Sequence, residues 1–126
     1  MKKLAYLIEA RRENMVNRGV MVATFEKFSG KTLLLKAEAF LTLDFFSIYP
    51  SDGNMVEVCY YEYNNSTPIM NEIFPIQDLE IPVNMLILLG EDVFSIQTLE
   101  KIPYKESYDT DIKKYKTELG FAKKQE

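Results

Sequence analysis

The sequence predicts an α+β domain made mainly of antiparallel β-strands. We expect five or six short strands in a small barrel or sandwich, about the size of an SH3 domain or an OB-fold, with a helix at each end. Turn signals rich in Gly, Pro, Asn and Asp recur at short intervals, which favours antiparallel strands over alternating strands and helices. The chain has 126 residues, 47% hydrophobic and 27% charged, values typical of one globular domain.

The first segment, residues 1–18, predicts an N-terminal helix. It contains good helix formers, and Gly19 follows as a candidate C-terminal cap. The apolar face of this helix would consist of Leu4, Leu7, Ile8 and Met15. Arg11 falls on the same stripe, so a strand is the alternative for the early residues.

Residues 19–102 predict the antiparallel β domain, beginning with a hairpin. Val20–Phe28 is rich in β-branched and aromatic residues, and Ser29-Gly30 offers a short turn into the next apolar run. From Lys36 onward the pattern alternates, with Ala37, Ala39, Leu41, Leu43 and Phe45 expected on one face of a strand. Many of these residues favour helices, so a buried helix over residues 32–48 is the alternative.

The firmest strand prediction is Met55–Tyr63, which follows a concentrated turn signal at residues 49–54. A short strand is expected at Ile69–Phe74. Further on, Met85–Leu89 and Val93–Leu99 flank Gly90-Glu91-Asp92 and predict a second hairpin.

Residues 103–126 predict a C-terminal amphipathic helix and a tail. The helix would bury a stripe of residues spaced by four, three and four positions: Tyr108, Ile112, Tyr115 and Leu119. Asp109 or Thr110 is the expected cap at its start, and Gly120 at its end.

The residue types that carry most enzyme chemistry are missing. The chain has no histidine, one cysteine and five glycines that stand singly, which removes imidazole catalysis, zinc sites of thiolate and imidazole, and Gly-rich phosphate loops. Cys59 lies in an apolar strand and is expected to be a buried structural thiol. We therefore expect a non-enzymatic protein without a cofactor or metal.

Charge is distributed unevenly along the chain. Residues 1–18 carry five basic and two acidic side chains, residues 19–102 carry four and twelve, and residues 103–126 carry six and five. The acidic centre argues against a single-strand nucleic-acid site on the sheet, because such sites need basic grooves. An acidic mimic of nucleic acid that inhibits a basic partner is one alternative function.

The favoured function is a protein-interaction or accessory module that binds a partner or itself through the C-terminal stripe Tyr108, Ile112, Tyr115 and Leu119. A second alternative is nucleic-acid binding through basic residues of both terminal segments: Lys2, Lys3, Arg11, Arg12, Arg18, Lys113, Lys114 and Lys116. The sequence shows neither a secretory signal nor an apolar run long enough to cross a bilayer, so we expect a cytoplasmic protein that does not bind membranes.

Overall fold

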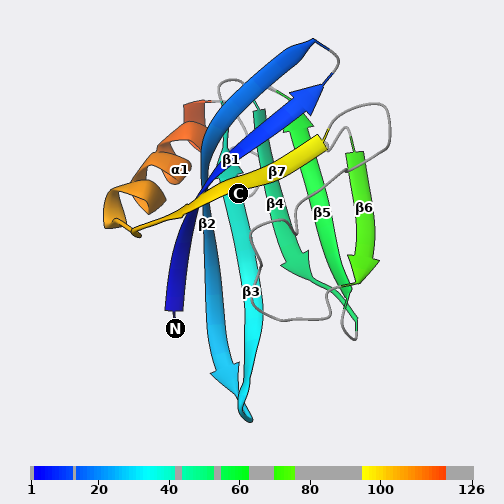
Figure 1. The fold of residues 1–126 in the computed structure, drawn as a ribbon, viewed down its shortest axis with the longest axis vertical. Helices are drawn as coiled ribbons and strands as arrows, with labels where there is room; N and C mark the ends of the chain where they lie inside the picture. Colours follow the sequence, from blue (N-terminus) through cyan, green and yellow to red (C-terminus); the bar gives the residue numbers. More distant parts are fainter. Residues whose placement is uncertain are drawn as a thin grey trace.

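The structure is a computed structural model in which one antiparallel sheet and one helix are described (Figure 1). It describes residues 2–12, 14–41, 44–52, 55–62, 70–75 and 95–118. The elements are β1 (Lys2–Arg12), β2 (Met15–Phe28), β3 (Lys31–Phe40), β4 (Asp44–Pro50), β5 (Met55–Glu62), β6 (Met70–Pro75), β7 (Ser95–Ile102) and α1 (Glu106–Glu118).

The strands pair in the order β6-β5-β4-β3-β2-β1-β7. β1 to β6 follow one another as a meander, and β7 returns to the far side of β1, with Ala5 opposite Ile102. Among the described strands, β6 and β7 are therefore edges, and the sheet is open. The predicted antiparallel class is confirmed. The predicted barrel is wrong, because the last strand pairs with β1 and not with β6, and the described strands form one sheet where a sandwich would have two.

The predicted N-terminal helix is also wrong, because these residues form β1 and the first part of β2. β1 lies between two strands, and its middle is buried on both faces, as the buried neighbours Ala5 and Tyr6 show. A strand buried on both faces reads as a continuous apolar run, so its two-residue period is hidden. Gly19 is not a helix cap but lies within β2, opposite Ile8.

The β2–β3 hairpin is confirmed. Its two-residue turn consists of Ser29 and Gly30, which have φ angles of 52° and 78°, and Phe28 pairs with Lys31 on either side of them. Two consecutive positive φ angles define the type I′ turn, whose twist matches that of a hairpin. β2 runs the length of the molecule between this turn and the β1–β2 connection at the opposite end (Figure 1).

Residues 32–40 and 44–48 are extended, so the alternative of a buried helix over residues 32–48 is excluded. It does not form one strand, however, because β3 ends at Phe40 and β4 begins at Asp44. Ala39 consequently faces one side of the sheet with the larger core cluster, whereas Phe45 faces the other side with α1. The predicted alternation failed beyond the chain reversal, since a reversal resets which face each parity occupies.

The strands predicted at Met55–Tyr63 and Ile69–Phe74 are confirmed as β5 and β6. The strand predicted at Val93–Leu99 overlaps β7, but the hairpin predicted around residues 90–92 lies outside the described residues. The C-terminal helix is confirmed as α1. It begins at Glu106, before the predicted cap residues, and acidic Glu106 and Asp109 fall in its first turn, where they favour the helix dipole.

One face of the sheet, the core face, carries the larger buried cluster. A single row of cross-strand neighbours runs across it: Tyr6, Met21, Ala39, Phe46 and Tyr60, each opposite the next. The rest of the cluster is Ile8, Ala10, Ala23, Phe25, Leu34, Ala37, Leu41, Ile48, Val56, Val58 and Ile96. Such cross-strand contacts are the units that stabilise a sheet.

The opposite face, the helix face, is where α1 packs, over β2 and β3. Its buried cluster consists of Val22, Phe45 and Ile112. Four tyrosines and Phe40 pack around them: Tyr61, Tyr104, Tyr108 and Tyr115. This apolar cluster holds α1 against the sheet. The polar residues beside the cluster border the space between the helix and the strands.

Candidate functional site

The predicted C-terminal stripe packs within its own chain. Ile112 is 4% exposed, and Tyr108 and Tyr115 pack against the same cluster. The centroid of the Tyr115 ring lies 5.5 Å from that of the Phe40 ring on β3. Leu119 lies outside the described residues. In the single chain, these side chains hold α1 on the sheet.

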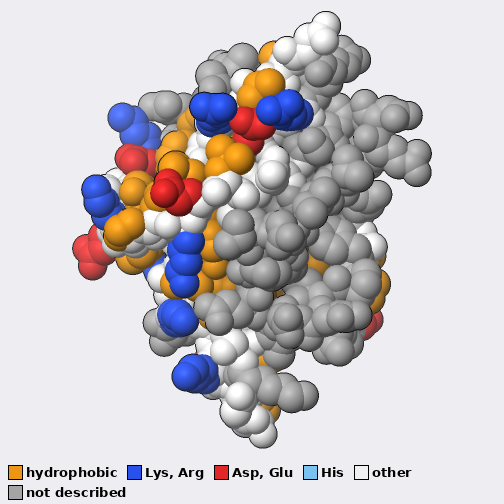
Figure 2. Space-filling model, in the orientation of Figure 1, with side chains coloured by type: hydrophobic (Ala, Val, Ile, Leu, Met, Phe, Trp, Pro, Cys, Tyr) orange, Lys and Arg blue, Asp and Glu red, His pale blue; other side chains and the backbone are white. Residues whose placement is uncertain are grey.

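The basic residues of the two ends converge only in part. Lys3 from β1 meets Lys113 and Lys116 from α1 at one pocket. Arg11 lies toward the other end of β1, roughly 26 Å from Lys3 at the usual rise of about 3.3 Å per strand residue. Arg18 lies on β2 opposite Glu9, which by the same rise is roughly 20 Å from Lys3 along the strands. Figure 2 accordingly shows basic side chains in separate places, interspersed with acidic and apolar ones.

Two further residues of the predicted basic set, Lys2 and Lys114, are exposed and do not line the pocket. The side chain of Arg12 is outside the described part of the chain. The acidic residues of the central segment are spread over several strands: among those that the structure describes, Glu57 and Glu62 lie on β5, Glu72 on β6 and Glu100 on β7.

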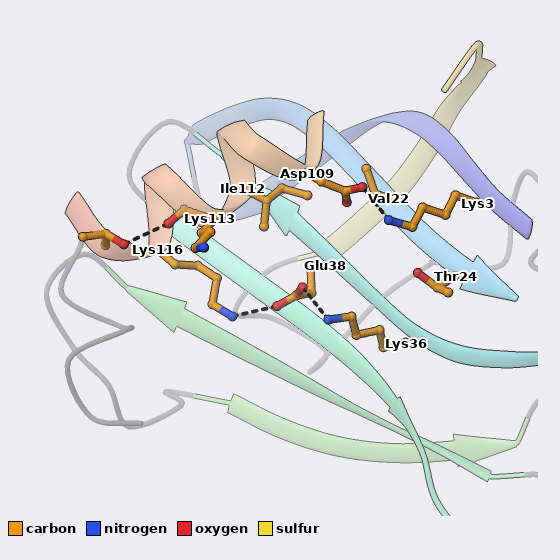
Figure 3. A pocket seen from close by; sticks show the side chains of 10 residues that line it. Lys3, Val22, Thr24, Lys36, Glu38, Asp109, Ile112, Lys113 and Lys116 are labelled. Atoms are coloured by element: carbon orange, nitrogen blue, oxygen red, sulfur yellow. Dashed lines mark hydrogen bonds and ion pairs between the residues drawn. The ribbon is translucent and has the colours of Figure 1, made fainter. Parts of the chain in front are cut away.

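The pocket lies between α1 and the helix face of the sheet and has a volume of about 410 Å³. Figure 3 shows it from close by, with side chains from β2 and β3 on one side and from α1 on the other. Its lining consists of Lys3, Val22, Thr24, Lys36, Glu38, Asp109, Ile112, Lys113, Lys116 and Thr117. The volume falls within the range of roughly 300–1,000 Å³ of small-molecule sites.

Glu38 joins the two sides of the pocket. Its carboxylate accepts from Lys116 Nζ on α1 at 2.9 Å and lies 3.3 Å from Lys36 Nζ on its own strand. Both partners of the cross-pocket pair are largely buried, with 18% of the Lys116 side chain and 13% of the Glu38 side chain exposed. Lys116 also lies over the ring of Phe45, 5.4 Å from its centroid. These contacts fix the position of the Lys116 ammonium group.

Asp109 makes the corresponding link at the other end of the pocket. It accepts from Lys3 Nζ at 2.7 Å and from the hydroxyl of Tyr104, and Lys3 lies 5.6 Å from the centroid of the Tyr104 ring. Burial opposes ionisation of Asp109, but the hydrogen bonds from Lys3 and Tyr104 outweigh it and lower the pKa of the carboxyl group. The hydrogen bond to Asp109 in turn raises the pKa of Lys3.

The pocket as a whole is positive. Four lysines and two carboxylates line it, and the lysines come from β1, β3 and α1. Val22 and Ile112 add an apolar area, and Thr24 and Thr117 add hydroxyl groups. This combination of ammonium donors beside an apolar surface suits a small anion with an apolar part.

Other polar groups on the helix face lie outside the pocket. The Cys59 thiol is buried, as predicted, and burial raises its pKa. Burial likewise raises the pKa of the neighbouring Tyr61 to about 12. Both groups are therefore protonated at neutral pH. Nowhere in the described chain do three or more Cys, Asp or Glu side chains come together as a metal site would require.

Sequence reasoning missed Lys36 and Glu38 as site residues. The available signal was the alternating pattern of the strand, which puts Lys36 and Glu38 on the face opposite Ala37 and Ala39. Their partners are distant in sequence, however, with Lys116 78 positions from Glu38. No local pattern indicates such a pairing.

Comparisons with known proteins found no family model, no curated protein and no solved structure that matches the chain. A function must therefore be inferred from the site. In the described part of the chain, no helix is long and apolar enough to cross a membrane.

Proposed function

We propose that the chain is a non-enzymatic binding module that holds a small anionic molecule in the pocket between α1 and the sheet. The observation that carries this proposal is the convergence of Lys3, Lys36, Lys113 and Lys116 around one space of about 410 Å³. These lysines come from three separate elements of the fold, so they meet only in the folded chain. The ligand would carry a carboxylate, sulfonate or phosphate group together with an apolar part.

The ion pairs across the pocket support this ligand class. Glu38 and Asp109 hold Lys116 and Lys3 in place, so less side-chain freedom remains to be lost when an anion binds. Two carboxylates do not balance four ammonium groups, and an anion would reduce this excess of positive charge. Val22 and Ile112 would contact the apolar part of the ligand.

The protonation states of the pocket support binding over catalysis. Lys3 has a raised pKa and Asp109 a lowered one, so both stay charged near neutral pH. Efficient general acids and bases have pKa values near the working pH, and the chain has no histidine to serve in this role. Lys3 and Asp109 are suited to fixed charges, which orient a ligand.

The experiment uses 8-anilinonaphthalene-1-sulfonate, a fluorescent aromatic anion, as the probe, and N-phenyl-1-naphthylamine as its uncharged analogue. We expect the sulfonate to bind the intact chain and Lys113→Glu to weaken that binding by about tenfold, as expected for loss of a charge-assisted contact. Lys114→Glu is the matched control, because it makes the same charge change on the next residue of α1, which does not line the pocket.

Circular dichroism would first establish that both variants keep the wild-type fold. Equal effects of the two substitutions on sulfonate affinity would contradict the proposal. So would equal binding of the charged and uncharged probes, since binding would then depend on apolar surface alone.

A further inference from the structure

A second charged surface lies near the end of the β1–β2 hairpin, away from the pocket. We call it the hairpin surface, and its residues are Glu9, Arg11, Val16 and Arg18. On the paired strands, Glu9 is directly opposite Arg18 and Arg11 is directly opposite Val16, so all four side chains share the helix face of the sheet. The hairpin forms one end of the molecule, at the top of Figure 1, and Figure 2 shows basic, acidic and apolar side chains together near that end.

Glu9 is the centre of this surface. Its side chain is buried, with 4% exposed, and each of its oxygens accepts from a different arginine. Arg11 Nε lies 2.5 Å from Oε1, and Arg18 Nε lies 3.1 Å from Oε2. The hydrogen bond from Arg11, aided by that from Arg18, lowers the pKa of Glu9 despite its burial. One buried carboxylate therefore positions two guanidinium groups.

The two arginines keep most of their surface in solvent. The side chains of Arg11 and Arg18 are 63% and 74% exposed. A guanidinium group carries five N–H donors in a planar fork, and the contact with Glu9 described above uses the Nε donor of each. Two arginines and one carboxylate leave an excess of one positive charge.

An exposed apolar side chain borders these arginines. Val16, directly opposite Arg11, is 50% exposed. Met15 is 55% exposed but pairs with Arg12, so it faces the other side of the sheet. Exposed apolar side chains beside arginines are characteristic of protein-binding surfaces, where arginine is enriched. Sites for nucleic acid instead need several cations to neutralise successive phosphates, and here one of the two positive charges is already balanced by Glu9.

We propose that the hairpin surface binds an acidic segment of a partner protein, with the carboxylates of that segment on Arg11 and Arg18 and an apolar side chain on Val16. The charge of the surface and its apolar border both match such a segment. This interaction is independent of the anion pocket, so each can fail without the other.

The test uses a fluorescein-labelled eight-residue peptide of alternating Glu and Leu, with binding measured by fluorescence anisotropy at about 50 mM salt. We expect the intact chain to bind this peptide and to bind its Gln–Leu counterpart at least tenfold more weakly. The double variant Arg11→Ala/Arg18→Ala should weaken binding of the acidic peptide by at least tenfold, because charge-assisted contacts are lost. Lys27→Ala/Lys101→Ala removes the same charge from exposed lysines elsewhere and should change affinity less than twofold.

A second pair of substitutions guards against misfolding, because removing both arginines leaves Glu9 buried and unpaired. Arg11→Lys/Arg18→Lys keeps a positive charge beside Glu9 but replaces the planar fork by a point charge, and we expect a loss of about threefold. Absence of peptide binding, or equal losses in the arginine and lysine-control variants, would overturn the proposal. Tighter binding of a 12-base-pair DNA duplex, lost in the arginine variants, would overturn it in favour of phosphate recognition.

Discussion

Gly19 on β2 lies against the backbone of Phe40 at the end of β3, so closely that a Cβ atom added to Gly19 would stand 1.8 Å from the Phe40 carbonyl oxygen. No rotation of a side chain can relieve such a contact, because the obstructing atom belongs to the backbone. Glycine at this position therefore allows the backbone at the end of β3 to approach β2 closely.

Gly19→Ala should destabilise the fold by about 3 kcal/mol, since the end of β3 must shift to admit the methyl group. Urea denaturation of wild type and variant measures this loss. Gly30 offers a contrast, because nothing lies within 4 Å of a Cβ added there and only its φ of 78° resists substitution. Gly30→Asn should cost less than about 1 kcal/mol, since Asn tolerates positive φ. Similar losses in both variants would contradict the role assigned to the Phe40 contact.

Acid should remove the contribution of Glu9 to stability. Its pKa is lowered from an ordinary value of 4.5, first by the hydrogen bond from Arg11. The ionised form is thus favoured by folding, and the stability it adds is present above about pH 4.5 and is lost as the pH falls through the lowered pKa. Thermal melting of wild type and Glu9→Gln should show a difference in Tm that is largest near neutral pH and narrows below pH 4.5. A difference that stays constant from pH 7 to pH 3 would exclude this role for the charge.

Ile112 should be the main apolar anchor of α1. It is 4% exposed and packs with Val22 and Phe45, so Ile112→Ala should cost about 2–4 kcal/mol. Thr110→Ala, at an exposed position of the same helix, should change stability by less than about 0.5 kcal/mol. Hydrogen exchange measures the local effect. Relative to wild type, Ile112→Ala should accelerate exchange of the α1 amides more than that of the amides of β4 and β5. Uniform acceleration throughout the sheet would show that α1 does not unfold separately.

Thr98→Val should stabilise the protein. The Thr98 side chain on β7 is buried, with 3% exposed, and within the described structure its hydroxyl has no hydrogen-bond partner. Replacing an unpaired buried hydroxyl by a methyl group of similar shape removes a desolvation cost, so a gain of about 1 kcal/mol is expected. Urea denaturation would check it, and a loss of stability would indicate that the hydroxyl is paired in solution.

The elements predicted correctly from the sequence are those with one apolar and one polar face and those that follow a distinct turn signal. β5 follows a turn of Pro, Ser, Asp, Gly and Asn, and α1 shows one apolar stripe because its other side faces solvent. β1 was mistaken for a helix because the middle of the strand is buried on both faces, which removes the alternation that identifies a strand. The reversal between Phe40 and Asp44 was missed because residues 40–46 contain neither Gly nor Pro.

The pocket could be predicted only as scattered charges. Lys3 and Asp109 are 106 positions apart, and their meeting depends on two later events in the chain: the pairing of β7 with β1 and the direction of α1 after Pro103. The sequence placed basic residues in both terminal segments, but it did not distinguish Lys3, which lines the pocket, from its neighbour Lys2, which does not. That distinction depends on which residues of β1 lie on the helix face of the sheet, and the prediction of a helix for this segment gave no such information.

The return of β7 to β1 has a consequence for how the protein folds. Every other strand pair described here joins consecutive strands, so those hairpins can form soon after their residues leave the ribosome. β1 must wait for its second neighbour until the chain has been made beyond residue 102, and in that interval its outer edge exposes unpaired peptide groups able to pair with other nascent chains. We expect this pairing to limit the rate of folding, since it closes the longest loop between any two paired strands described here.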